Sequence, residues 1–174
     1  MLTPPLQVAL LRGVNLGKRT VVMSELRALV EGAGYSDVRT LLASGNVVLG
    51  SKLKGVKLEA KLEALFVEGL GFKVDVYVRD HAELVKAIDG NPFGAFAKAS
   101  PSFMLAFFMR ENPGAALVKS LGAQGGPEEI AAGPRCVYLK FPNGQGASKL
   151  ELPSTGTARN WNTVTKLAAM AADE

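Results

Sequence analysis

The sequence predicts an α+β fold, because strand patterns and amphipathic helix patterns alternate along the whole chain. Hydrophobic residues make up 48% of the 174 residues and charged residues 21%, a balance typical of a folded globule rather than a disordered chain. A chain of this length can form one domain or two small domains that share a core. The order of the predicted strands and helices indicates which α+β arrangement to expect.

The first half of the chain predicts strands and helices in an informative order. Apolar residues recur at helical spacing over 23–34 and 57–71, and both segments end in glycine. Val74, Val76 and Val78 alternate with polar neighbours, as in a strand with one buried face. Strands are expected over 7–13, 37–43, 46–50 and 73–79. The order strand, helix, strand, strand, helix, strand is the split βαβ, or ferredoxin-like, arrangement.

The second half is less regular. The expected elements are a short helix after residue 80, a central strand over 102–109, a short helix over 113–122, a strand over 135–141 and a last helix over about 157–172. The glycine- and proline-rich stretch 122–134 is expected to be mostly loop. A boundary in "GNPFGAF" gives a ferredoxin-like part over 1–92 and a second, smaller α+β part over 93–174.

Composition excludes several classes of site. The chain has one cysteine, Cys136, and one histidine, His81, so we expect no internal disulfide, no Cys/His zinc site and no other metal site. We also expect no cofactor. The start does not resemble a signal peptide, and no apolar run is long enough for a membrane helix, so the cytoplasm is the expected location. A net charge of +4 permits anionic partners without requiring them.

Several motifs carry a resemblance to a known family. "LRGVN", "VRT", "SGNVV", "NPF" and "RNWNT" occur in this order along nearly the whole chain. The sequence resembles the bacterial family known as domain of unknown function 1697. It departs from that pattern at Gly17-Lys18, where the family often has two glycines, and at Leu49, where it often has an aromatic residue. The resemblance implies an α+β fold with a ferredoxin-like subdomain, and it implies no activity.

The loop "RGVNLGKR" (12–19) is a candidate anion site. A glycine-bearing loop between a strand and a helix can direct backbone N–H groups at an anion, and Lys18 and Arg19 would add charge. The spacing matches neither the P-loop nor the dinucleotide-binding fingerprint. The alternative is an ordinary connection in which Gly13 and Gly17 supply positive φ angles.

The stretch "ASGNV" (43–47) is interpreted as a tight hairpin turn. Asn46 can hydrogen-bond its own backbone neighbourhood in such a turn. Ser44 lacks both an adjacent base and the G-x-S-x-G elbow of a nucleophilic serine, so a structural role is favoured over catalysis.

The stretch "TARNWNTVTKL" (157–167) is expected to be helical, with Trp161 packed inward. Thr157 is the expected N-cap, which places Arg159 in the first turn. An arginine there opposes the helix dipole, so we expect it to have an anionic partner, either a carboxylate or a ligand. The opposite, polar face would carry Arg159, Asn162, Thr163 and Lys166.

The leading functional hypothesis is a non-catalytic module that binds an anionic ligand, either a nucleotide, a phosphate or a nucleic acid, through a basic polar surface. The candidate binding residues are Arg12, Asn15, Lys18, Arg39, Ser44, Asn46, Arg159, Asn160, Asn162 and Lys166. The side chains of Arg12 and Arg159 are expected to converge. The alternatives are an enzyme of unidentified reaction that uses the same motifs, and an assembly protein that pairs through a sheet face.

Recognition of RNA bases by stacking is not expected. An RRM stacks bases on aromatic side chains of its central strands. The two central-strand candidates, "VALLRG" (8–13) and "NVVLGS" (46–51), contain no aromatic residue. Nucleic acid would therefore be held through its phosphates, with a strong dependence on salt.

Overall fold

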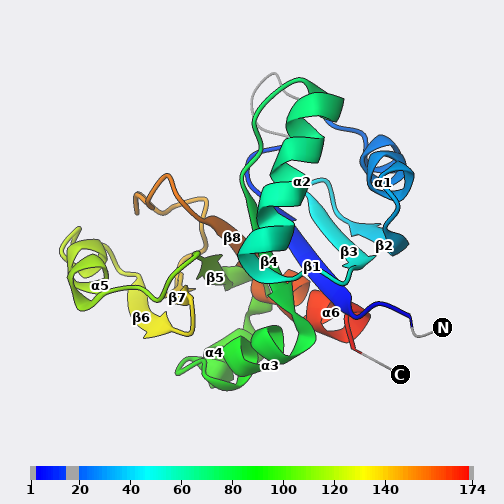
Figure 1. The fold of residues 1–174 in the computed structure, drawn as a ribbon. Helices are drawn as coiled ribbons and strands as arrows, with labels where there is room; N and C mark the ends of the chain where they lie inside the picture. The colour runs from blue at the N-terminus through cyan, green and yellow to red at the C-terminus, as the bar shows by residue number, and fades with distance from the viewer. Residues whose placement is uncertain (1–2, 15–19, 173–174) are drawn as a thin grey trace. The chain divides into compact units, whose positions relative to one another are not determined.

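The computed structural model describes residues 3–14 and 20–172, and it forms two compact units. Unit 1 consists of Met1–His81 and Leu167–Glu174, and unit 2 of Ala82–Lys166. Each unit contains its own four-stranded sheet (Figure 1). The domain boundary expected between residues 92 and 93 stays a prediction.

Unit 1 has the ferredoxin-like order that the sequence predicts. Its elements are β1 (Leu6–Leu11), α1 (Met23–Gly32), β2 (Ser36–Leu41), β3 (Asn46–Gly50), α2 (Gly55–Leu70) and β4 (Val76–Asp80). The strands lie in the order β2-β3-β1-β4, and all neighbours are antiparallel. The central strands are therefore β1 and β3, and neither contains an aromatic residue.

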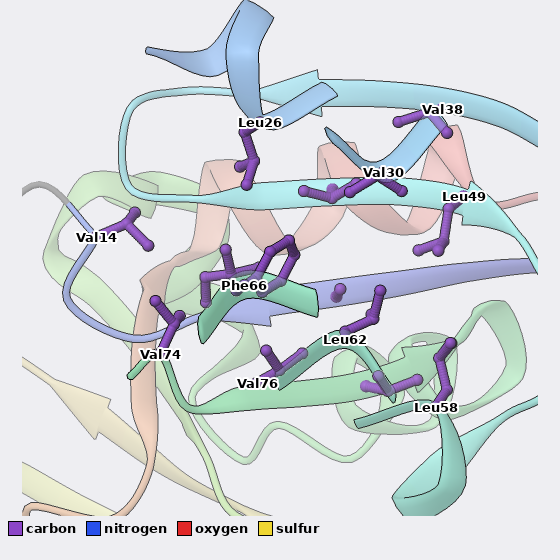
Figure 2. Close-up of a cluster of buried hydrophobic side chains, with 14 of the residues drawn as sticks. Val14, Leu26, Val30, Val38, Leu49, Leu58, Leu62, Phe66, Val74 and Val76 are labelled. Atoms are coloured by element: carbon purple, nitrogen blue, oxygen red, sulfur yellow. The ribbon is translucent and has the colours of Figure 1, made fainter. Parts of the chain in front are cut away.

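One face of this sheet forms the core of unit 1 with α1 and α2. Ala9 on β1 pairs with Val47 on β3 and with Val78 on β4, so all three side chains point to the same face. Leu26 of α1 and Phe66 of α2 pack in the same buried cluster (Figure 2). The apolar residues at helical spacing and those that alternate along the strands pack together in this core.

Two glutamates of α2 cover the free edge of β4. An Oε2 atom of Glu59 accepts a hydrogen bond from the backbone N–H of Val78 at 2.9 Å, and Glu63 accepts one from Val76 at 3.1 Å. Glu59 is only 1% exposed. Edge strands present unpaired N–H groups that favour pairing with other chains. Here carboxylates one helical turn apart satisfy two of these groups.

The end of helix α6 (Trp161–Met170) belongs to unit 1. An Nη2 atom of Arg39 donates to the carbonyl oxygen of Met170 at 2.6 Å, and Nδ1 of His81 lies 2.8 Å from the carbonyl oxygen of Ala168. The last carbonyl groups of a helix have no intrahelical donor. These two side chains therefore hold the last turn of α6 to the sheet of unit 1.

Unit 2 contains the remaining elements. They are α3 (His81–Asp89), whose first residue, His81, belongs to unit 1, α4 (Gly94–Ala99), the 3₁₀ helix η1 (Pro101–Phe103), β5 (Met104–Phe108), α5 (Ala115–Gly122), β6 (Glu129–Gly133), β7 (Cys136–Lys140), β8 (Thr157–Asn160) and the start of α6. The strand order is β6-β7-β5-β8, again antiparallel throughout. Phe107, Val137 and Leu121 pack on one face of this sheet. On the other face, the hydroxyl of Tyr138 donates to the carbonyl oxygen of Ala87 in α3 at 2.6 Å.

Three expectations about the second half were wrong or incomplete. The expected loop 122–134 contains β6, because residues 129–133 pair with β7 as the edge strand of the sheet. The expected helix from Thr157 begins only at Trp161, because residues 157–160 form β8 beside β5. The short helix α4 was not expected, since "GNPFGAF" was interpreted as a boundary.

Within residues 3–14 and 20–172, no helix has the length and apolar character needed to cross a membrane.

Candidate functional site

The side chains of Arg159, Asn160 and Thr163 in "RNWNT" have hydrogen-bond partners within unit 2. Oδ1 of Asn160 accepts hydrogen bonds from the backbone N–H of Thr163 at 3.0 Å and from its hydroxyl at 3.2 Å. Asn160 is therefore the N-cap of α6, and the expectation that Thr157 has this role was wrong. Thr163 is buried, which also corrects its expected place on a polar face, whereas Asn162 and Lys166 are exposed.

Arg159 lies in β8 rather than in the first turn of a helix. Its side chain is 6% exposed, and Nη1 donates to the carbonyl oxygen of Ala158 at 2.8 Å and to Oγ1 of Thr157 at 2.5 Å. Burial lowers the pKa of Arg159 to about 10, so the group is still charged at neutral pH. The dipole argument for an anionic partner does not apply at this position.

Ser44 and Asn46 are joined within the turn that connects β2 to β3. Nδ2 of Asn46 donates to the carbonyl oxygen of Leu41 at 2.7 Å and to Oγ of Ser44 at 3.0 Å. The carbonyl oxygen of Gly45 accepts a bond from the N–H of Leu11 at 2.9 Å. Asn46 is fully buried. These contacts support the interpretation of "SGN" as a structural turn.

Replacing Gly45 by alanine is expected to destabilise the protein by about 1–2 kcal/mol. Gly45 has a φ of 89°, and an added Cβ would lie 2.6 Å from a methyl group of Val14. Thermal or urea unfolding of Gly45→Ala measures the loss. The matched control is Gly94→Ala in α4, where an added Cβ meets nothing within 4 Å. Equal stability of Gly45→Ala and the parent protein would contradict the expectation.

The first-loop residues are only partly described. Gly13 has a φ of 68°, as expected for its turn, and the backbone N–H of Arg12 donates to the carbonyl oxygen of Asp75 at 2.9 Å. Asn15 and Lys18 lie outside the described residues. Arg12 belongs to unit 1 and Arg159 to unit 2, and the convergence of their side chains stays a prediction.

Arg39 lines a groove of about 950 Å³ that is formed within unit 1. The N-terminal segment, α1, β2 and the end of α6 form its walls. The bond from Arg39 to Met170 holds the guanidinium at the groove. Arg27 and Glu31 also line it and form an ion pair with each other at 3.1 Å. Among the described residues, the guanidinium of Arg39 pairs with no carboxylate.

Asp37 adds an acceptor to the same groove. It lies at an irregularity in the pairing of β2 with β3, between Ser36 and Arg39, and has a φ of 49°. A β-bulge changes the direction of the side chains beside it, and aspartate tolerates the left-handed region better than most residues. The groove thus combines an exposed cation and an exposed carboxylate on one short strand.

The sequence analysis missed one concentration of charge, the lysine cluster formed by Lys52, Lys54, Lys57 and Lys61. All four side chains are exposed, and in the part of the chain that the structure describes none of them forms an ion pair. The run "KLKGVKLEAKLE" is visible in the sequence. Only the structure shows that Glu59 and Glu63 of this run bond to β4 rather than to these lysines.

No group of three or more His, Cys, Asp and Glu side chains that could hold a metal ion occurs in the described ranges. Cys136 is fully buried in β7.

The comparisons with known proteins agree with this fold. No curated protein matches the chain. A solved structure described as conserved bacterial protein SP0830 from Streptococcus pneumoniae matches with a TM-score of 0.75 and 22% sequence identity, over 98% of this chain and 99% of that chain. At this identity the match shows the α+β fold alone. Residues 6–138 match the family described as "Protein of unknown function (DUF1697)". The motifs and this match agree, and the chain belongs to the DUF1697 family.

Proposed function

We propose that the protein is a non-catalytic module that binds a nucleotide or a similar phosphorylated small molecule in the groove of unit 1. The observation that carries this proposal is the guanidinium of Arg39. It lines the groove, is held by Met170 and has no carboxylate partner among the described residues. A guanidinium has more N–H donors than this one bond uses, and its planar fork matches phosphate and carboxylate oxygens.

The other charges of the groove favour a ligand with both an anionic group and hydroxyl groups. Arg27 and Glu31 form an ion pair with each other. Arg39 and Asp37 are therefore the charged groups of the groove that would contact a ligand. A carboxylate accepts hydrogen bonds and repels a second anion. A sugar phosphate or nucleotide would satisfy both groups, with its phosphate on Arg39 and a sugar hydroxyl on Asp37. The volume of about 950 Å³ is within the range of ligand sites.

Arg39→Gln is expected to weaken binding of such a ligand by about 10- to 100-fold. This is the range for loss of one hydrogen-bonded charge contact. A thermal-shift screen with nucleotides and sugar phosphates identifies a ligand through its stabilisation of the folded state. Isothermal titration calorimetry of the parent protein and the variant then measures the two dissociation constants.

Lys98→Gln is the matched control, because it removes one exposed positive charge from unit 2 and none from the groove. Equal weakening by both variants would indicate an effect of net charge and would contradict a site at Arg39. Absence of binding by any compound of the screen would contradict the proposal. Conversion of a bound compound, followed by NMR, would favour the enzyme hypothesis instead.

A further inference from the structure

We propose that the lysine cluster at the start of α2 binds the phosphate backbone of a nucleic acid. This surface is separate from the groove, and the proposal does not depend on a ligand there. It rests on three observations about α2: the direction of its lysines, the contacts of its glutamates and the residues beside the cluster.

The lysines of α2 lie on one side of the helix and its first glutamates on the other. At 3.6 residues per turn, Lys57 and Lys61 fall within about 40° of each other, whereas Glu59 and Glu63 fall on the opposite half. Lys54, the extended N-cap residue, and Lys52 add positive charge just before the helix begins. All four lysine side chains are exposed.

The glutamates that could neutralise these lysines are engaged elsewhere. Glu59 and Glu63 hydrogen-bond the backbone of β4, and Glu59 is almost fully buried. The positions three and four residues from Lys57 and Lys61 hold leucine, alanine or lysine and no acid. Lys57 and Lys61 are themselves four residues apart, a spacing at which like charges repel. Among the described residues, no carboxylate therefore pairs with this row of lysines.

The length of the row fits a polyanion better than a single phosphate. From Lys57 to Lys61 the helix rises about 6 Å, at 1.5 Å per residue, and Lys52 and Lys54 extend the row beyond the start of the helix. One DNA strand presents a phosphate about every 3.4 Å along the axis, so several phosphates fall within reach of the row. A free phosphate could meet only one end of it.

The neighbouring residues favour nucleic acid over a membrane surface. Amphipathic helices that bind membranes insert large apolar side chains such as Trp, Phe or Leu. The exposed large apolar residues of α2 are Val56 and Val67, and its one aromatic residue, Phe66, is fully buried. Without aromatic side chains for stacking, the cluster would hold phosphates and read no base sequence.

The test is a fluorescence-anisotropy titration of labelled DNA duplexes of two unrelated sequences, at several salt concentrations from about 50 mM upward. The full chain is compared with a variant in which Lys52, Lys54, Lys57 and Lys61 are all replaced by glutamine. We expect the parent to bind both duplexes with similar affinity. The variant should bind more weakly, with a log–log salt slope flatter by about three units.

The matched control replaces Lys86, Lys98, Lys119 and Lys149 by glutamine. These exposed lysines of unit 2 carry the same total charge, and circular dichroism of both variants verifies the fold. A similar loss in both variants would overturn the proposal, as would an absence of duplex binding near 50 mM salt. Binding to anionic phospholipid vesicles or polyglutamate without duplex binding would assign the cluster to another partner. Arg39→Gln should leave the salt slope unchanged, which separates this site from the groove.

Discussion

Trp161→Ala is expected to lower the free energy of unfolding by about 3–5 kcal/mol, the usual cost of truncating a buried tryptophan. Trp161 is 7% exposed at the first position of α6, and its ring lies 6.4 Å from that of Tyr138 at a tilt of 59°. The substitution removes this aromatic contact and leaves a cavity beside the central strand β7. Stability is measured by urea unfolding.

The unfolding of this variant has to be followed by circular dichroism, because the chain has a single tryptophan. In the parent protein, the same residue should give blue-shifted fluorescence that iodide quenches poorly. Trp161→Phe keeps a large ring and should cost less than the alanine variant. Red-shifted, freely quenched emission from the folded parent would contradict a packed Trp161.

Glu59→Ala is expected to cost roughly 2–3 kcal/mol, although the residue is a charged group in a helix. Its Oε2 atom accepts a bond from the N–H of Val78, a residue that is itself fully buried. Truncation leaves this N–H group without its partner and away from water. Urea unfolding gives the loss, and hydrogen exchange at Val78 reports the opening of the β4 edge directly.

Two further variants separate this effect from a general loss of charge. Glu59→Gln keeps an oxygen that can accept the bond and should recover a large part of the stability. Glu68→Ala removes an exposed carboxylate near the end of the same helix and should change stability by less than about 0.5 kcal/mol. If Glu59→Ala behaves like Glu68→Ala, the edge contact contributes little.

The fold of unit 1 could be predicted because each element has its own periodic pattern. Val74, Val76 and Val78 face one side, and the helices α1 and α2 end near glycines. The start of α6 could not be placed in this way. The β8 segment is only four residues long and runs directly into the helix, so a helical pattern drawn from Trp161 extends backward over it. The pairing with β5 decides its conformation.

The candidate site was less predictable than the fold. Arg39 was named from the "VRT" motif, but its position in a groove depends on Met170, which lies 131 residues further along the chain. The lysine cluster was missed for a similar reason. Whether Glu59 neutralises a lysine or bonds to β4 depends on the packing of α2 against the sheet, which no local pattern reveals.

The division of unit 1 along the chain has a consequence for synthesis on the ribosome. Its sheet is complete once β4 ends at Asp80. Ala168 and Met170, whose carbonyl oxygens contact His81 and Arg39, follow the whole of unit 2 in the sequence. A nascent chain therefore exposes the sheet face of Arg39 and His81 while roughly half of its length has still to be translated. During that interval the face is open to chaperones, and the last turn of α6 closes it only after unit 2 has emerged. Mutations that slow the folding of unit 2 would then prolong the exposure of unit 1.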